Sequence, residues 1–333
     1  MFGAAKCTKD GITSAIAWYS AGSSPGNPAI KFHSTRIPSS ASPRPAICWG
    51  VTLRVSLADF FSFPNEIVAF AEHADELGFE RFWVGEHHTR SQCANPLLLA
   101  AVLAGLTQSI RIGTGATLLS SRGAIAVAED ARILSQLYGD RIDVGVTGGW
   151  SPLFAAACSE LAGLLRLDAP SEANMPHTSS TPAPWLMVTR PEAAVHAGEL
   201  GLGMCASFHH GGTRNGVRGL IDRYRGAFRP GSHAAPHSIV MISGVCAENE
   251  AALEDARASY AEATSRLAGA ASTHRSVSFD GIPSTVTDLA LAEAATVGAD
   301  EVMLLFLEPR PDGVARLSPV IAEIAAHAGL VRR

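Results

Sequence analysis

The sequence predicts a (β/α)8 TIM barrel, in which eight parallel strands alternate with helices around one core. Two observations predict it. Eight short, apolar, β-branched runs recur along residues 47–333, and helical patterns lie between them. The runs are apolar almost throughout instead of alternating, which is typical of strands buried on both faces of a parallel sheet. Eight such units in a chain of this length fit a closed barrel better than an open doubly wound sheet.

The predicted strands define a single barrel domain over residues 47–333. They are Ile47–Val55, Phe79–His88, Ile110–Leu119, Arg141–Thr147, Trp185–Thr189, Leu202–Phe208, Ser238–Ala247 and Glu301–Leu307. The helices between them carry the expected start and stop residues. Pro64 opens the first helix at a position where proline is tolerated, Ile67 and Phe70 belong to its apolar face, and Gly78 ends it. The other predicted helices cover about 96–107, 124–138, 191–200, 214–228, 249–268, 284–297 and 314–328.

Two segments fall outside this rhythm. Residues 1–46 hold five basic side chains and one acidic one, and they lack sustained periodicity. We expect them to be a disordered or non-native N-terminal extension, with a transit peptide as the alternative. In residues 151–184 a predicted helix over about 153–166 precedes a loop rich in Pro, Ser and Thr, which we expect at the barrel mouth.

Composition and charge exclude several classes of protein. The chain is 47% hydrophobic and 17% charged, so it folds around a sizeable core. It has no uninterrupted apolar stretch of a membrane-spanning length. A net charge of −5 without a long basic run argues against a nucleic-acid binder. The six cysteines are far apart and form no Cys-x-x-Cys pair, which argues against a zinc ribbon or a disulfide scaffold and favours a reducing, cytoplasmic compartment.

The active site of such a barrel lies at the carboxyl ends of its strands. The second predicted strand ends at Trp83-Val84-Gly85-Glu86-His87-His88. Because strand side chains alternate, Trp83 and His87 should share one face, and Glu86 and His88 the other. The two histidines therefore cannot easily bind one metal ion. His87 facing the cavity could serve as a general acid or base, and the alternative is that both histidines are structural.

Three other strand ends carry candidate binding residues. The fourth ends at Thr147-Gly148-Gly149-Trp150, where small residues would make room for a flat ligand, although a plain turn is the alternative. After the fifth, Thr189-Arg190 precedes a helix that Pro191 opens, which could be an anion site suited to a cofactor phosphate, or simply an exposed polar loop. After the sixth, a loop with His209 and His210 could line a substrate or phosphate site, or could simply be exposed. No Gly-x-Gly-x-x-Gly follows a strand, which argues against a Rossmann site.

The run Gly78–His88 resembles the bacterial luciferase-like flavin-dependent monooxygenases. Further motifs share its order and spacing over about residues 49–150, and weaker matches follow at 197–201, 224–228 and 298–305. The further motifs are Asn95–Ala101, Arg111–Gly115, Ala128–Asp130 and Gly139–Gly145. No single motif is specific for this family, whereas the motifs taken together, in this order and spacing, are specific for it.

The resemblance implies a barrel, usually dimeric, that binds reduced FMN supplied by a separate flavin reductase and oxidises a small organic substrate with oxygen. Such a substrate could be an intermediate of natural-product biosynthesis. The family's catalytic histidine carries over to His87, where it would transfer protons or donate hydrogen bonds. A non-prolyl cis peptide of many members would fall at Gly115-Ala116, next to the cofactor. Some relatives use a deazaflavin coenzyme instead, and others are non-catalytic flavin-binding proteins or silent subunits.

This chain departs from the family at the expected cofactor positions. Luciferases proper have Cys-Arg-Gly where Thr147-Gly148-Gly149 stands here, and Ser-rich phosphate ligands where Thr189-Arg190 stands. Arg190 could supply the missing positive charge. The segment 151–182 is also shorter than in most relatives. We therefore expect a flavin against Gly148 and Gly149 with its phosphate near Arg190 or the loop His209–Arg214, and a substrate pocket with Trp150, His209 and His210.

Overall fold

The computed structural model describes residues 54–88, 93–166, 180–208, 212–267, 277–308, 310 and 312–330. The predicted extension 1–46, most of the loop predicted after residue 166, and His209 and His210 lie outside the described residues. Nine strands are described: β1 (Arg54–Asp59), β2 (Arg81–Val84), β3 (Arg111–Leu118), β4 (Ile142–Thr147), β5 (Ala183–Val188), β6 (Gly203–Ser207), β7 (Ser238–Cys246), β8 (Phe279–Gly281) and β9 (Glu301–Phe306).

Eight of these strands close into a parallel barrel. β1 to β7 and β9 form a ring in which β1 pairs with β9, β9 with β7, and β7 with β6. The short β8 pairs only with the end of β7. The predicted TIM barrel is therefore confirmed, with one small strand added beside the ring.

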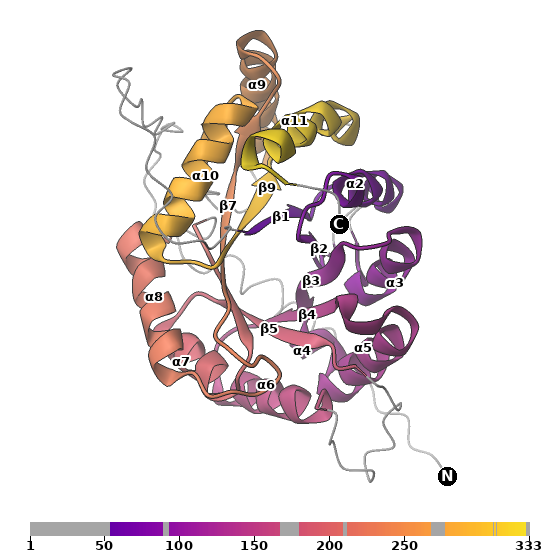
Figure 1. Cartoon of the computed structure of the whole chain (residues 1–333), viewed down its shortest axis with the longest axis vertical. Helices are drawn as coiled ribbons and strands as arrows, with labels where there is room; N and C mark the ends of the chain where they lie inside the picture. Colours follow the sequence, from indigo (N-terminus) through magenta and orange to yellow (C-terminus); the bar gives the residue numbers. More distant parts are fainter. Residues whose placement is uncertain are drawn as a thin grey trace.

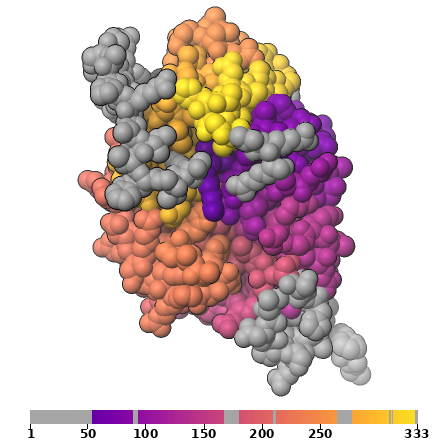
Figure 2. All heavy atoms as spheres, viewed as in Figure 1, coloured from indigo at the N-terminus to yellow at the C-terminus, as the bar shows by residue number. Residues whose placement is uncertain are grey.

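Helices surround the strands on the outside (Figure 1). They are α2 (Pro64–Glu76), α3 (Pro96–Leu106), α4 (Leu119–Arg122), α5 (Ala124–Tyr138), α6 (Pro152–Leu164), α7 (Pro191–Glu199), α8 (Arg214–Ala227), α9 (Glu250–Leu267), α10 (Pro283–Val297) and α11 (Gly313–Ala328), with a 3₁₀ turn η1 (Gly139–Arg141). The indigo start and the yellow end of the described chain lie side by side (Figure 2), because α11 packs on α2. Among the described residues, no helix has the length and apolarity needed to cross a bilayer.

The boundaries differ from the prediction at the first two strands. β1 extends to Asp59 instead of ending at Val55, because Leu57 pairs with both Phe82 and Leu304. β2 ends at Val84 instead of His88, although the backbone beyond it still bonds to the neighbouring strand. The sequence pattern does not predict the short elements α4 and β8, because three or four residues are too few to show a periodicity.

The interior of the barrel is a core separate from the layer between strands and helices. Its members include Ala58, Phe60, Trp83, Trp185, Cys205, Met241, Met303 and Leu305. Glycines make room for the two indoles, since a Cβ on Gly113 would lie 2.4 Å from Trp83 Cε3, and one on Gly203 would lie 2.3 Å from Trp185 Cε3. The indoles meet edge to face with 5.6 Å between centroids.

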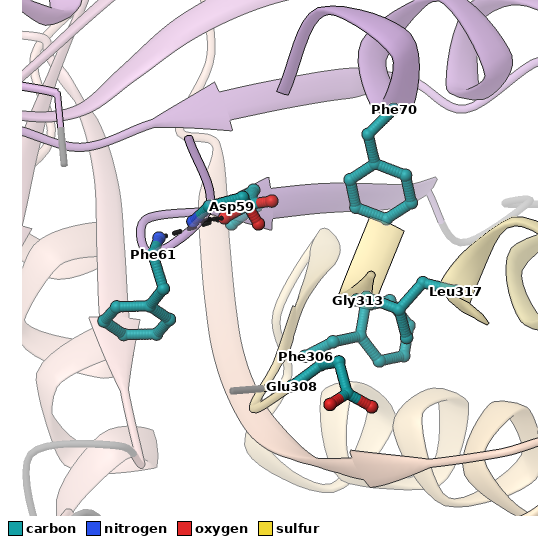
Figure 3. Close-up of a pocket in the computed structure, with 9 residues that line it drawn as sticks. Asp59, Phe61, Phe70, Phe306, Glu308, Gly313 and Leu317 are labelled. Carbon is teal, nitrogen blue, oxygen red and sulfur yellow. Dashed lines mark hydrogen bonds between the residues drawn. The ribbon is translucent and has the colours of Figure 1, made fainter. Parts of the chain in front are cut away.

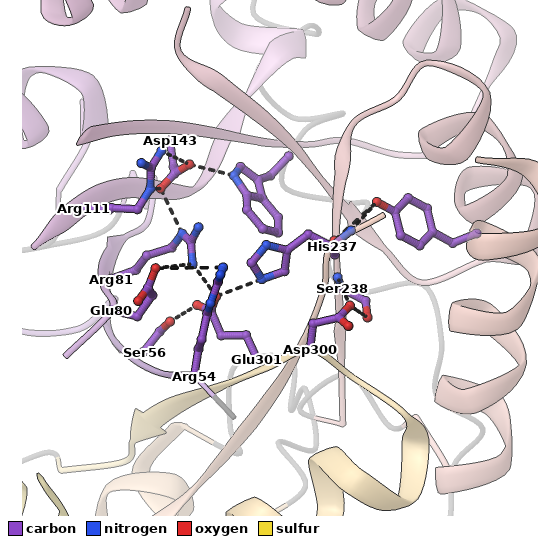
Figure 4. Close-up of polar contacts among 12 residues, drawn as sticks. Arg54, Ser56, Glu80, Arg81, Arg111, Asp143, His237, Ser238, Asp300 and Glu301 are labelled. Atoms are coloured by element: carbon purple, nitrogen blue, oxygen red, sulfur yellow. Dashed lines mark hydrogen bonds and ion pairs between the residues drawn. The ribbon is translucent and has the colours of Figure 1, made fainter. Parts of the chain in front are cut away.

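Buried charges close the amino end of the barrel (Figure 4). Asp143 accepts hydrogen bonds from Arg81 Nε at 3.0 Å and from Arg111 Nε at 2.8 Å. Glu301 pairs with Arg81 and accepts a hydrogen bond from Ser56. The two arginines hold the pKa of Asp143 at about 2, below its usual value, despite complete burial. Each buried carboxylate at this end is thus compensated by a paired arginine, and the carboxyl end is left for chemistry.

Candidate active site at the barrel mouth

The carboxyl ends of the strands surround a mouth with an apolar floor. Met187, Cys205, Met241 and Leu305 alternate along their strands with residues of the outer layer, so they point into the barrel, and Phe60, directly after β1, packs in the same cluster. Burial raises the pKa of the Cys205 thiol, which keeps it neutral and makes it a poor nucleophile. Such a floor suits a flat organic ring.

His87 lies at this mouth, two residues beyond the interior-facing Gly85. Its ring centroid is 6.3 Å from that of Phe60 and 5.9 Å from that of Phe61. Its backbone N–H donates to the carbonyl oxygen of Cys93 at 2.8 Å, which joins the end of β2 to the start of α3. The imidazole therefore belongs to the inner face, as the alternation of the strand predicts.

The opposite face carries Glu86, whose side chain is fully buried. Its carboxylate is 2.7 Å from Nε2 of His88 and accepts the backbone N–H of Leu118 at 2.9 Å. Arg122 Nε approaches the same carboxylate at 3.3 Å. Glu86 and His88 thus fix the rim between β2 and β3, while His87 faces the mouth.

The end of β3 is irregular beside this rim. The peptide bond between Gly115 and Ala116 is cis, at the position that the resemblance predicts. The pairing with β4 shifts between Thr114 and Thr117, and the carbonyl oxygen of Ala116 accepts the backbone N–H of Glu86 at 3.2 Å. The predicted cofactor residues Gly115 and Ala116 therefore lie next to the end of β2 that carries His87.

The residues after β4 lie partly outside the mouth. Thr147 pairs with Leu118 at the rim, Gly148 is half-buried and Gly149 is exposed. A Cβ on Gly148 would lie 2.6 Å from Phe154 Cδ2, so a ring of α6 already takes the room on that side. Trp150 packs edge to face on Phe154, with 6.2 Å between ring centroids, and on His196, with 5.5 Å, and so lies against α6 and α7.

The residues after β5 are exposed at the start of α7. Thr189 and Arg190 immediately precede Pro191, and Arg190 occupies the N-cap position without a side-chain hydrogen bond to the helix. No ion pair to a described residue is found for the Arg190 guanidinium. The helix dipole and an exposed guanidinium make this rim position suitable for an anion.

Asp59, which the sequence analysis did not single out, is a buried carboxylate beside the candidate site. It ends β1 with its side chain on the face opposite Phe60, 7% exposed, and borders a cavity of about 10 Å³ that Phe70 and Leu317 also line (Figure 3). Burial raises the pKa of this carboxyl. The signal that the sequence offered was an acidic residue placed between an apolar run and the two phenylalanines Phe60 and Phe61. In the described part of the chain, no three His, Cys, Asp or Glu side chains could hold a metal ion.

Comparisons with known proteins agree on one family. The family model described as "Luciferase-like monooxygenase" matches residues 62–158. The "Uncharacterized protein YwcH" of Bacillus subtilis (strain 168) is 31% identical over 219 residues, which are 57% of this chain and 65% of that protein. The "N-acetyl-S-alkylcysteine monooxygenase" of the same organism is 28% identical over 209 residues, 55% and 63% of the two chains. The chain thus spans slightly less than two thirds of these curated relatives.

Solved structures share the fold over most of the chain. Apo-MsnO8 is 25% identical with a TM-score of 0.69, covering 84% of this chain and 100% of that one. A type II Baeyer-Villiger monooxygenase constituent from Pseudomonas putida, solved in complex with FMN, is 15% identical with a TM-score of 0.61, covering 83% and 98%. An F420-dependent secondary alcohol dehydrogenase is 15% identical with a TM-score of 0.60, covering 82% and 99%.

Proposed function

Because the chain is similar to the luciferase-like monooxygenases, we propose that it is a member of this family and an oxidoreductase. It oxidises a small organic substrate with oxygen and reduced FMN, which a separate flavin reductase supplies. The observation that carries this proposal is the imidazole of His87 at an apolar mouth, against Phe60 and Phe61. One oxygen atom enters the substrate and the other leaves as water.

The residues at the mouth fit a flavin by their chemistry. The apolar floor with Met187 and Met241 suits a flat ring, and the rim at Thr189 and Arg190 offers a hydroxyl and a guanidinium to a phosphate. The glycines Gly148 and Gly149 offer backbone amides to the ring, although Phe154 takes the space on one side of Gly148. When bound, reduced FMN supplies the electrons that activate oxygen.

His87 holds or moves a proton at an imidazole nitrogen during the oxidation. The packing of the phenylalanine rings limits the contact of the imidazole with water. Trp150 and the loop with His209 and His210 complete the substrate pocket in this proposal. The substrate class could include biosynthetic intermediates.

A titration of the purified protein tests the cofactor. Reduced FMN and a reduced deazaflavin coenzyme are added separately under anaerobic conditions, and binding is followed by tryptophan fluorescence. We expect the tighter binding for FMN, and a clear preference for the deazaflavin would replace the oxygenase by a hydride-transferring oxidoreductase. Tight FMN binding without substrate-dependent oxygen uptake would indicate a non-catalytic flavin-binding protein.

A matched pair of variants tests the role of His87. We expect His87→Ala to lower substrate oxidation by about 100-fold or more, the range of general acid–base catalysis. His327→Ala removes an exposed imidazole on α11 that pairs with Asp288, and it should leave oxidation unchanged. Equal activity of the wild type and His87→Ala would remove His87 from the mechanism.

A second copy of this chain is the proposed partner. Leu98, Val102 and Leu106 recur every four residues on α3 and are exposed, with Leu98 at 65%. Ile133 and Leu137 form a similar exposed stripe on α5, which packs beside α3. Apolar stripes with helical spacing on neighbouring helices are typical of a helix-packing interface. These stripes support a homodimer.

A further inference from the structure

The carboxylate of Asp59 holds the turn between β1 and α2. Its Oδ1 accepts the backbone N–H of Phe61 at 2.9 Å and that of Ser62 at 3.0 Å. A buried carboxylate that accepts two backbone N–H groups fixes a turn more firmly than a neutral acceptor does. The conformation of this turn therefore depends on one side chain.

The same turn places two aromatic rings on the catalytic histidine of the proposed reaction. Phe60 and Phe61 both contact the His87 ring, from 6.3 and 5.9 Å between centroids. Phe60 also lies close to the strand that carries His87, because a Cβ on Gly85 would lie 2.9 Å from Phe60 Cδ1. A shift of the turn would therefore move the surroundings of the imidazole directly.

We propose that Asp59 is a positioning residue for His87. Its carboxylate fixes the turn, and the two phenylalanines of the turn set the orientation of the imidazole and keep water from one side of it. The proposal rests on the proposed function only for the importance of His87, because the contacts exist without any cofactor. Loss of the carboxylate loosens the turn, admits water, and makes the imidazole easier to protonate.

Other titratable groups around His87 are arranged differently. Glu86 and His88 bond to each other on the opposite face of the strand, with Arg122 beside them. Asp59 itself lies on the outer face of β1, where Glu308 borders the same cavity and is paired with Arg310. The phenylalanine turn is thus the described link between Asp59 and the imidazole.

The test is an NMR titration of the His87 ring in the full-length protein. The His87 signal is assigned by its absence in His87→Gln. Asp59→Ala and Phe61→Leu should raise the midpoint of this titration by about 0.5 pH unit or more. Asp59→Asn keeps an oxygen at the acceptor position and should shift the midpoint by less than half as much.

The matched control is Asp75→Ala. Asp75, at the other end of α2, also accepts backbone N–H groups, from Gln108 at 2.7 Å and Ile110 at 2.7 Å, and it lies away from the mouth. Asp75→Ala should therefore lower thermal stability without moving the His87 midpoint. An equal shift in Asp75→Ala would reduce Asp59 to a general structural role and overturn the proposal.

Two further outcomes would also overturn the positioning role of Asp59. In the first, Asp59→Ala folds and the His87 ring titrates with the wild-type midpoint. If Asp59→Ala does not fold, Phe61→Leu carries the test, and an unchanged midpoint in that variant refutes the link through the turn. The titration needs neither flavin nor substrate, so its result is independent of oxidation assays. Shifted midpoints in a protein that oxidises nothing would refute the proposed function and leave the positioning role standing.

Discussion

Replacement of Asp143 by asparagine is the sharpest test of how the barrel is stabilised. The Asp143 carboxylate accepts hydrogen bonds from Arg81 at 3.0 Å, from Arg111 at 2.8 and 2.9 Å, and from the indole N–H of Trp185 at 2.9 Å. Asp143→Asn keeps the shape and removes the charge. Arg81 would keep its ion pair with Glu301, whereas Arg111 would lose the carboxylate with which it pairs.

The structure gives the magnitude of this effect. The fall of the Asp143 pKa from its usual 3.8 to about 2 corresponds to about 2 kcal/mol of stabilisation of the charged form. Removal of one partner from a buried ion pair typically costs about 3–5 kcal/mol, because the other charge is left uncompensated. We therefore expect Asp143→Asn to lower the free energy of unfolding by about 2–5 kcal/mol. That is a large share of the roughly 5–15 kcal/mol of a typical domain.

Urea unfolding followed by tryptophan fluorescence measures the loss, since Trp83 and Trp185 lie inside the barrel. A loss of this size should lower the urea midpoint by about 1–2 M. The control is Asp288→Asn, which removes an exposed carboxylate paired with His327 and should cost less than about 1 kcal/mol. Equal midpoints for Asp143→Asn and the wild type would refute the view that this charge stabilises the amino end.

Three further results are expected. The contribution of the Asp143 carboxylate to the free energy of unfolding is fully present above about pH 4 and is lost as the pH falls through about 2, because the pKa of Asp143 is lowered in the folded state. Urea midpoints measured against pH should show this loss in the wild type, and Asp143→Asn should lack it. Gly203→Ala should destabilise the protein by about 1–3 kcal/mol in the same assay, because the added methyl group would meet Trp185. The double variant Leu98→Glu and Leu137→Glu should sediment as a monomer where the wild type sediments as a dimer, and a wild-type monomer would contradict the proposed interface.

The barrel could be predicted from the sequence because its strands are buried on both faces. Runs such as the one that becomes β7 are apolar at almost every position, and this pattern needs no knowledge of the neighbouring strands. Side-chain alternation also placed Trp83 and His87 on one face and Glu86 on the other. These predictions depend on local geometry alone.

The remaining features depend on contacts between distant residues. Asp143 and Glu301 meet the same arginine across 158 positions of the chain, and no local pattern marks that meeting. In the sequence Asp59 is an ordinary polar residue at a strand end. Its role depends on the folded turn, which brings the backbone N–H groups of Phe61 and Ser62 to its carboxylate. The packing of Trp150 on α6 and α7 likewise depends on how the helices are placed, so a position at a strand end did not by itself locate its side chain.

The separation of the buried charges from the mouth has a consequence for how this protein can change. Among the described residues, the ion pairs of Arg81 and Arg111 at the amino end share no side chain with the rim around His87, and effects of substitutions at well-separated sites are usually additive. Rim loops can therefore be exchanged between homologous proteins to alter selectivity without eroding thermal tolerance. A chimaera that combines the rim loops of a homologous protein with the amino end of this barrel should unfold near the melting temperature of the parent protein.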